Sequence, residues 1–266
     1  MRVRSESWLS DLLEAATKVF IAKGYRQTQM SDIARDMGVS QGTLYNYVES
    51  KEALFLLVCE RGFSDSPIEP PQQPPIASPS FEAMLQRIRE RMFSSVRLDA
   101  LRAALSTKNV VDARAELEGV LREFYSVIER FRHGFDLVER SALEVPEMAQ
   151  MLFVKGRREG VGAFAQYLTN RIESGHFKPV PDAATAARFV IETVTWFARH
   201  RHNTPDSQMI SDKDALETTI HFLIGALIPG DRHQNKRPRR RTRSIRADVG
   251  GGRQVMDADG LKRKSH

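Results

Sequence analysis

Residues 24–53 of this 266-residue chain, GYRQTQMSDIARDMGVSQGTLYNYVESKEA, constrain its fold more than any other stretch. Apolar residues recur at three- and four-residue spacing from Met30 onward, which predicts a helix with one buried side. We expect Thr28 to cap that helix and Gly38 to end it. Ser40 offers a hydroxyl that can cap a second helix directly afterwards. The stretch therefore predicts two short helices joined by a tight turn.

The second of these helices, residues 41–47, carries few apolar and many hydrogen-bonding side chains. Gln and Asn amides can form paired hydrogen bonds with adenine, and Thr offers a hydroxyl and a methyl group to thymine. Gly42 would let the start of the helix approach another molecule closely. Lys51 begins a further helix that Ser50 can cap, and an ammonium beside free backbone amides can grip phosphate. The pattern favours a helix-turn-helix, at residues 30–49, that enters the major groove of double-stranded DNA.

This part of the chain resembles the DNA-binding domain of the TetR (tetracycline repressor) family, over roughly the first sixty residues. The matching residues are Gly24-Tyr25, Asp32-Ile33-Ala34, Gly38-Val39-Ser40, Gly42-Thr43-Leu44-Tyr45 and Ser50-Lys51-Glu52-Ala53-Leu54. The resemblance implies an all-α protein. In it, a three-helix helix-turn-helix domain precedes a helical ligand-binding and dimerisation domain.

The resemblance also implies which residues meet DNA. Three would reach base edges and three would contact the phosphate backbone, namely Gln41, Thr43 and Asn46 for the bases and Tyr45, Tyr47 and Lys51 for the phosphates. Ser31 lies where members of the family often place a contact from the preceding helix. Ser40 and Gly42, at the tip of the second helix, complete the predicted DNA-binding set.

Two other interpretations of this stretch remain open. Any small helical domain can contain a Gly-Val-Ser turn, so the unit could be a helical hairpin that does not bind DNA. Residues 38–42 also fit the G-x-S-x-G pattern of a hydrolase nucleophile elbow, but that elbow needs a strand before the serine. A helix is expected there instead, so we predict no catalytic residue and no enzyme.

Composition divides the whole chain into four parts. Residues 64–80 contain six prolines, which predicts an extended or semi-rigid connector. The expected parts are a DNA-binding domain at residues 6–65, a Pro-rich linker at 66–80, a helical regulatory and dimerisation domain at 81–229, and a basic disordered tail at 230–266.

Helical periodicity continues through the regulatory domain. A helix over residues 117–138 is apolar on so much of its surface that we expect it to be central. Two final helices are expected at 182–199 and 211–228, and the resemblance makes them the interface of a homodimer. Palindromic DNA sites need two reading helices about 34–36 Å apart, which favours pairing. The alternative is that these two helices form ordinary intramolecular core.

The basic charge is concentrated in the tail. Residues 231–266 hold twelve Lys or Arg and four Asp, a net charge of +8, whereas the whole chain carries +6, so the remainder carries −2. The tail could contact DNA phosphates without sequence preference, or it could only be solvated. Arg2 and Arg4 could reach phosphate from an N-terminal arm, although terminal arginines are more often simply exposed.

The regulatory domain could enclose an apolar small molecule of unknown identity. The candidate lining residues are Phe124, Phe131, Phe135 and Trp196, and the same side chains would equally serve a dry core. The histidines show no convincing metal-ligand spacing, so no metal and no cofactor are predicted. Cys59 lies among apolar residues and is expected to be buried, with a redox sensor as the minor alternative.

The sequence therefore predicts a sequence-specific DNA-binding transcriptional regulator, a ligand-responsive repressor that binds a palindromic operator as a homodimer. No apolar run approaches the roughly 20 residues of a membrane span, and we expect a cytoplasmic protein. Two alternatives stay open: a DNA-binding architectural protein without an effector, and a helical ligand-binding module that does not bind DNA.

Overall fold

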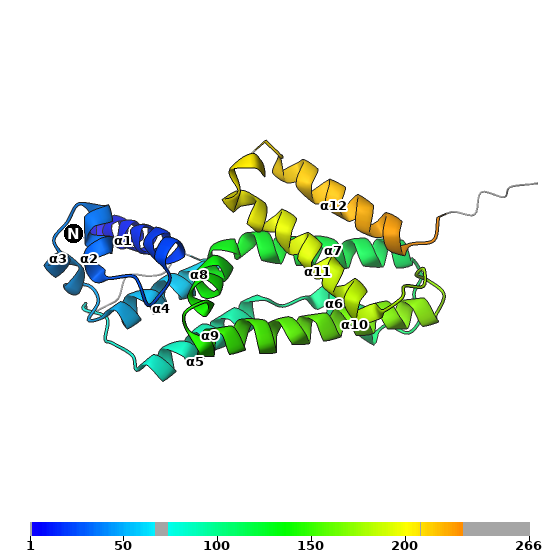
Figure 1. Ribbon diagram of the computed structural model, residues 1–266, viewed down its shortest axis with the longest axis horizontal. Helices are drawn as coiled ribbons and strands as arrows, with labels where there is room; N and C mark the ends of the chain where they lie inside the picture. Colours follow the sequence, from blue (N-terminus) through cyan, green and yellow to red (C-terminus); the bar gives the residue numbers. More distant parts are fainter. Residues whose placement is uncertain (1, 67–73, 208, 231–266) are drawn as a thin grey trace, which may run out of the picture. The chain divides into compact units, whose positions relative to one another are not determined.

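The computed structural model describes residues 2–66, 74–207 and 209–230, with the backbone alone for residues 2–6. Residues up to Gly230 form one compact unit. No β-strand occurs among the described residues (Figure 1), so the all-α prediction is confirmed for them. The elements are α1 (Arg2–Lys23), α2 (Met30–Met37), α3 (Gln41–Tyr45), α4 (Lys51–Gly62), α5 (Phe81–Ser95), α6 (Asp99–Ser106), α7 (Ala113–Arg130), α8 (Arg132–Ala142), α9 (Pro146–Ala149), the π-helix η1 (Gln150–Gly156), α10 (Arg157–Glu173), α11 (Ala183–Ala198), the 3₁₀-helices η2 (His200–Asn203) and η3 (Pro205–Ser207), and α12 (Asp212–Leu227).

Helices α2 and α3 form the expected pair, and the turn between them begins at Gly38. This glycine adopts a left-handed conformation with φ of 67°, where a side chain would be strained. The Thr28 cap was predicted wrongly, because the N-cap of α2 is Gln29. The Gln29 amide donates to Asp32 Oδ2 at 3.0 Å, while the Thr28 hydroxyl donates to the Gly24 carbonyl at 2.7 Å.

Helix α3 ends two residues earlier than expected because the chain after it pairs with the end of the Pro-rich segment. The Ile76 amide donates to the Tyr47 carbonyl at 2.7 Å, and the Glu49 amide donates to the Ile76 carbonyl at 3.0 Å. The Ser78 hydroxyl lies 2.6 Å from that of Ser50. Ile76 and Ser78 thus tie the described end of the linker to the end of the helix-turn-helix.

The single helix expected over residues 117–138 is in fact two helices, α7 and α8, separated at Phe131. No proline marks this break. The φ and ψ angles of Phe131 are −99° and 21°, which leave the α-helical region. The break allows Gly134 of α8 to cross α4 at Gly62. A Cβ atom on Gly134 would lie 2.7 Å from the Gly62 carbonyl oxygen, so only glycine permits this approach.

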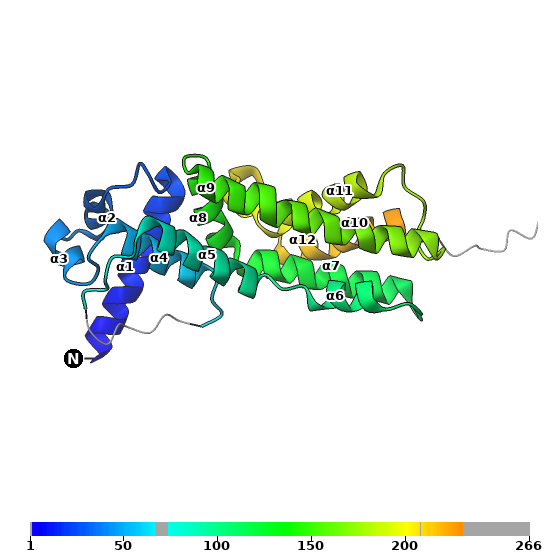
Figure 2. The same ribbon diagram turned by 90° about the horizontal axis from the view of Figure 1, so that it is seen from below.

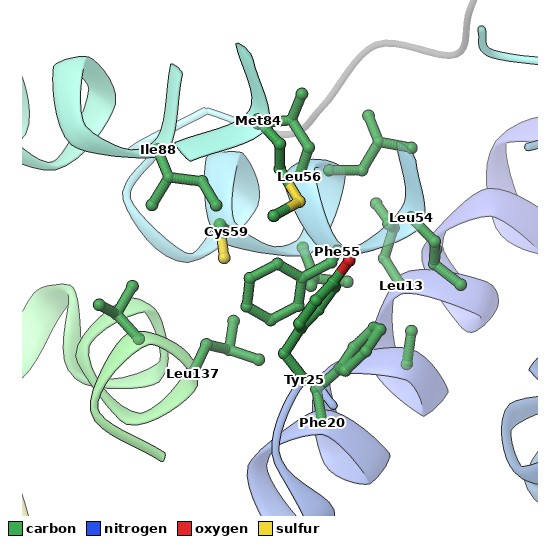
Figure 3. Close-up of a cluster of buried hydrophobic side chains, with 14 of the residues drawn as sticks. Leu13, Phe20, Tyr25, Leu54, Phe55, Leu56, Cys59, Met84, Ile88 and Leu137 are labelled. Carbon is green, nitrogen blue, oxygen red and sulfur yellow. The ribbon is translucent and has the colours of Figure 1, made fainter. Parts of the chain in front are cut away.

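Two apolar cores fill the unit. The first joins α1–α4 to parts of α5, α8 and α9, and Figure 3 shows Phe20, Tyr25, Phe55, Met84 and Leu137 directed toward one another from α1, the loop after it, α4, α5 and α8. Cys59 lies in this core, where burial raises the pKa of its thiol well above the usual range. The predicted burial of Cys59 is therefore confirmed.

The second core joins α6, α7, α10, α11 and α12, which lie side by side in both ribbon views (Figures 1 and 2). Asp182 and Ser211 cap α11 and α12 at the amides of Thr185 and Asp214. These two helices occupy the residues expected for them to within a residue or two. The proposed boundary between two domains near residues 65–80 stays a prediction, and both cores draw on residues after it.

Several sequence predictions concern residues that lie outside the described part of the chain. The basic tail, residues 231–266, lies outside the described residues, as do linker residues 67–73. Helix α1 includes Arg2 and Arg4 in its backbone, but their side chains are not described. Among the described residues, no helix is long and apolar enough to cross a membrane.

Candidate DNA-binding surface and ligand cavity

The orientation of α3 is fixed by one apolar residue and one cap. Leu44 is fully buried against the first core, and the Ser40 hydroxyl accepts a hydrogen bond from the Thr43 amide at 3.3 Å. Because Leu44 alone faces inward, the rest of this short helix is turned outward. Ser40, Gln41, Gly42, Tyr45 and Asn46 are exposed, and Thr43 is half-buried with its hydroxyl 2.9 Å from that of Ser40.

No contact or backbone angle within the protein requires glycine at position 42. The Gly42 backbone does not adopt a positive φ, and a Cβ atom there would meet only the Ser40 hydroxyl, at 3.8 Å, an ordinary contact. The missing side chain instead leaves the outer face of the helix start bare. This is what close approach by another molecule requires.

Tyr47 is half-buried because its ring stacks on Trp8 of α1. The ring centroids lie 3.7 Å apart with 19° between the planes. Trp8 was not among the predicted site residues, and a tryptophan early in a helix gives no sequence signal for this role. The stacking fixes the Tyr47 ring next to α3, so that the hydroxyl has a defined position.

Lys51 is turned inward in this structure. Its ammonium donates to the carbonyls of Tyr25, Thr28 and Arg26 at 3.0, 3.1 and 3.4 Å, and lies 4.6 Å from the centre of the Tyr25 ring. Burial lowers its pKa. The carbonyls belong to the loop between α1 and α2, so Lys51 holds that loop. A phosphate contact by Lys51 stays a prediction, and it would have to compete with these carbonyls.

Ser31, in the first turn of α2, is half-buried, and its hydroxyl lies 3.4 Å from the Gln29 side-chain oxygen. The structure thus places Ser31, the α3 residues, Tyr47 and Lys51 around one helix-turn-helix. Contacts of these residues with DNA remain predictions.

The C-terminal half of α8 holds the loop before α2, a connection that sequence reasoning did not find. Glu144, just after α8, accepts hydrogen bonds from the Arg26 amide at 3.1 Å and the Gln27 side chain at 2.5 Å. Arg140 donates to the Lys23 carbonyl at 3.2 Å. Gly24, with φ of 86°, lies so close that a Cβ atom would be 2.7 Å from Glu144. Charged residues more than a hundred positions away in the sequence give no local signal of such a contact.

A largely apolar cavity of about 510 Å³ lies between α5, α6, α7, α8, α10 and α11. Phe124 and Phe135 line it, together with Leu101, Ile128 and Phe164. The other two predicted pocket residues lie elsewhere. Phe131 is buried in the first core beside Phe63, and Trp196 is 38% exposed, with its ring packed edge-on against Phe197.

A second, polar cavity of about 820 Å³ brings together Glu129, His202 and Asp212. Each can offer one ligand atom, and these atoms lie within 4.8 Å of one another. The sequence gave no metal-ligand spacing, because the three residues come from α7, η2 and α12. Arg201, 3% exposed on its side chain, pairs with Asp212, so a guanidinium already neutralises part of the negative charge.

The second helix of this helix-turn-helix is exposed and carries a glycine at its start. The helix-turn-helix is joined to a helical bundle that encloses an apolar cavity. This combination is typical of DNA-binding regulators. The comparisons agree with that class. A sequence model described as bacterial regulatory proteins of the tetR family matches residues 12–58.

Two relatives and one solved structure extend the similarity beyond this segment. The HTH-type transcriptional activator FasR of Mycolicibacterium smegmatis is 29% identical over 217 residues, 81% of each chain. The uncharacterised HTH-type regulator YfiR of Bacillus subtilis is 28% identical over 182 residues, 68% of this chain and 74% of YfiR. SCO3833, a TetR-family regulator from Streptomyces coelicolor, superposes with a TM-score of 0.50 at 20% identity, covering 82% of this chain and 91% of the other.

Residues 12–58 thus match the TetR family, and the longer alignments show similarity to HTH-type transcriptional regulators over most of the chain. The resemblance noted from the sequence is confirmed, and so is the prediction of a helix-turn-helix DNA-binding regulator. The relatives are transcriptional regulators. The residues that fit G-x-S-x-G span the turn between α2 and α3, so a helix precedes their serine.

Proposed function

We propose that this protein is a cytoplasmic, ligand-responsive repressor without enzyme activity, which binds an inverted repeat in DNA as a homodimer. The α3 surface carries this proposal. Its outward side offers the exposed side-chain amides of Gln41 and Asn46, and Gly42 leaves room for a base pair beside the helix start. The similarity to the HTH-type transcriptional repressor KstR2 of Mycobacterium tuberculosis, 22% identical over 191 residues, 70% of this chain and 76% of KstR2, supports repression, whereas the relative FasR is an activator.

Three exposed aromatic side chains on α11 and α12 support the homodimer. Phe189 and Phe222 are 65% and 69% exposed, and Trp196 lies seven residues, two helical turns, after Phe189 on the same side of α11. Exposed aromatic side chains are typical of protein interfaces, and the two helices that carry them pack against each other. A second copy of the same face is the occupant we propose, because it would also place two α3 helices for the two halves of one inverted repeat.

The oligomeric state tests the interface directly. Phe189→Glu with Phe222→Glu should give a monomer by analytical ultracentrifugation, since charges would be buried unpaired at the contact. Val111→Glu is the matched control, because Val111 is fully exposed but lies outside α11 and α12. A wild-type monomer, or a dimer that survives both substitutions, would reject this interface.

Selection of bound sequences from a random DNA pool, at a stated salt concentration, tests the DNA function. An inverted repeat should be enriched. Asn46→Ala should then cost about 1–3 kcal/mol on the selected site and relax preference at one base pair. Asn109→Ala, at an exposed loop residue away from α3, should change neither. Equal losses on selected and random DNA for Asn46→Ala would contradict base reading.

The second candidate function, an architectural DNA-binding protein, rests on the basic tail, with +8 over residues 231–266. It predicts that no sequence is enriched and that binding fades steeply as salt rises, because phosphate contacts release counterions. Removal of the tail would then abolish binding.

A further inference from the structure

The apolar cavity between α5 and α11 carries positive charge at its border. Its lining includes four arginines, Arg97, Arg102, Arg157 and Arg199, and a single carboxylate, Glu159. The rest is mainly aliphatic and aromatic. Ligand sites of about 300–1,000 Å³ have this composition, with an apolar body and a few charged groups that fix orientation. A cavity of about 510 Å³ with this border fits a molecule that has a long apolar part and an anionic end.

The four arginines differ in how far their charge is already paired. Arg199 is buried, donates to Asp136 at 2.6 Å and also pairs with Glu139. Arg97 and Arg102 are both more than half exposed and share Asp99, at 3.5 and 3.2 Å. These three arginines therefore already have close carboxylate partners.

Arg157 lacks such a partner. Its side chain is 24% exposed, and its carboxylate neighbours Glu139 and Glu192 lie 3.8 and 3.9 Å away, beyond a good hydrogen bond. Within the described residues, its guanidinium forms no hydrogen bond, and it packs 5.1 Å from the Phe153 ring. A partly buried guanidinium with unused donors beside an apolar cavity is suited to bind an oxyanion in a bidentate manner.

The local backbone points to the same place. Arg157 directly follows the π-helix η1, Gln150–Gly156, a rare conformation that recurs at functional sites. Leu152 and Gly156 of η1 line the cavity, and so does Gly160, one turn beyond. A Cβ atom on Gly160 would meet nothing within 4 Å, so that part of the cavity wall is bare.

We propose that the effector of this regulator is an amphipathic anion, with its hydrocarbon part in the cavity and its acidic group on Arg157. This inference rests on the proposed function and names the chemistry of its effector. It also gives the effector a route to α3. Arg157 and Arg199 share Glu139 of α8, so an anion on Arg157 alters the pairing of α8. Helix α8 in turn crosses α4 at Gly134 and, through Arg140, holds the end of α1.

Three probes of equal chain length test the chemistry by isothermal titration below their micelle concentrations. Palmitate carries a carboxylate, palmitoyl-coenzyme A carries phosphates, and hexadecanol is uncharged. At least one anion should bind about tenfold or more tightly than hexadecanol, because a charge-assisted pair adds at least one tenfold step in affinity. Preference for palmitate would identify a free acid as the ligand type, and preference for palmitoyl-coenzyme A a phosphorylated thioester.

Two pairs of variants locate the binding. Arg157→Gln should remove the preference for the anion over hexadecanol, whereas Arg158→Gln, an exposed neighbour outside the cavity, should keep it. Gly160→Leu should fill the bare wall and lower the affinity for every probe about tenfold or more. Gly162→Leu, on the exposed side of the same helix, should not. Both leucines favour the helix, so folding is preserved.

The outcomes separate this inference from the proposed function. Suppose that the wild-type protein enriches an inverted repeat but binds hexadecanol as tightly as the anions, or that Arg157→Gln keeps the preference for the anion over hexadecanol. The proposed effector chemistry is then wrong, while the proposed regulatory function is retained. If no probe binds, the inference is also wrong. If the anions bind with dependence on Arg157 but no DNA sequence is enriched, the regulatory function fails and the ligand site stands. On the selected DNA, the preferred anion should weaken wild-type binding and leave the binding of Arg157→Gln unchanged.

Discussion

Individual residues of the helix-turn-helix divide into those that face outward and those that hold the unit together. Gly42 and Lys51 were both predicted to contact DNA, yet the structure gives them opposite surroundings. Gly42 has no neighbour that requires glycine, and Lys51 has three carbonyl acceptors. We therefore expect a substitution at Gly42 to affect mainly DNA binding and a substitution at Lys51 to affect mainly the stability of the fold.

Gly42→Ala should leave the free energy of unfolding unchanged or raise it by up to about 1 kcal/mol, because alanine favours a helix and the new methyl group meets no clash. Affinity for the selected DNA should nevertheless fall, since the methyl group separates α3 from the groove. Denaturant titration and DNA titration of the same protein measure both. Unchanged affinity would place Gly42 away from DNA.

Lys51→Met should lower the free energy of unfolding by about 1–3 kcal/mol, because three backbone carbonyls lose a charged donor. Lys18→Met is the matched control, since this lysine is 71% exposed and pairs, within the described part of the chain, only with Asp36. It should change stability by less than about 0.5 kcal/mol. If Lys51→Met unfolds like wild type and only flattens the salt dependence of DNA binding, the ammonium acts on phosphate alone.

At the scale of elements, α8 connects the cavity to the helix-turn-helix. Phe135 lines the cavity and packs edge-on against Phe63, with ring centroids 5.3 Å apart. The residue directly before it, Gly134, touches the backbone of Gly62 in α4. Because α8 touches the cavity, α4 and, through Arg140, the end of α1, we expect a change in α8 at the cavity to reach both helices.

Gly134→Ala should destabilise the protein by about 1–3 kcal/mol, because its methyl group would lie 2.7 Å from the Gly62 oxygen and backbone must move. Gly119→Ala on α7, with nothing within 4 Å, should be neutral or stabilising. Thermal unfolding of both variants measures the contrast. Equal melting temperatures would mean that α4 and α8 do not cross so closely.

At the scale of the whole molecule, we expect the free energy of unfolding to decrease as the solution becomes mildly acidic. Burial, followed by neighbouring arginines, lowers the pKa of His133 and of His200 from their ordinary value near 6.5. The unfolded chain then binds protons at a higher pH than the folded one. The stability associated with these neutral imidazoles is present above about pH 6.5 and is lost as pH falls through the lowered pKa values.

Melting temperatures measured from pH 7.5 down to pH 5.5 check this expectation. The wild-type melting temperature should fall across that window, and the double variant His133→Gln with His200→Gln should show a shallower fall. The raised pKa of Glu129, caused by burial and then by Asp212, acts in the opposite direction, and comparison with the double variant removes its contribution. Parallel curves for the two proteins would contradict the assignment to these histidines.

The sequence by itself determined the local features of this protein. Spacing of apolar residues and the positions of Gly38, Ser40 and Ser50 placed α2, α3 and α4, because helix starts and ends depend on neighbouring residues. The same local signals, with the family resemblance, identified the class of protein and both final helices.

Tertiary structure alone decided which distant residues meet. The break at Phe131, the inward turn of Lys51 and the return of Ile76 to the end of α3 all depend on partners far away in the chain. Arg157 lines the cavity, whereas Phe131 and Trp196 do not. An apolar residue suits a core and a pocket equally, so its place depends on the packing of the whole fold.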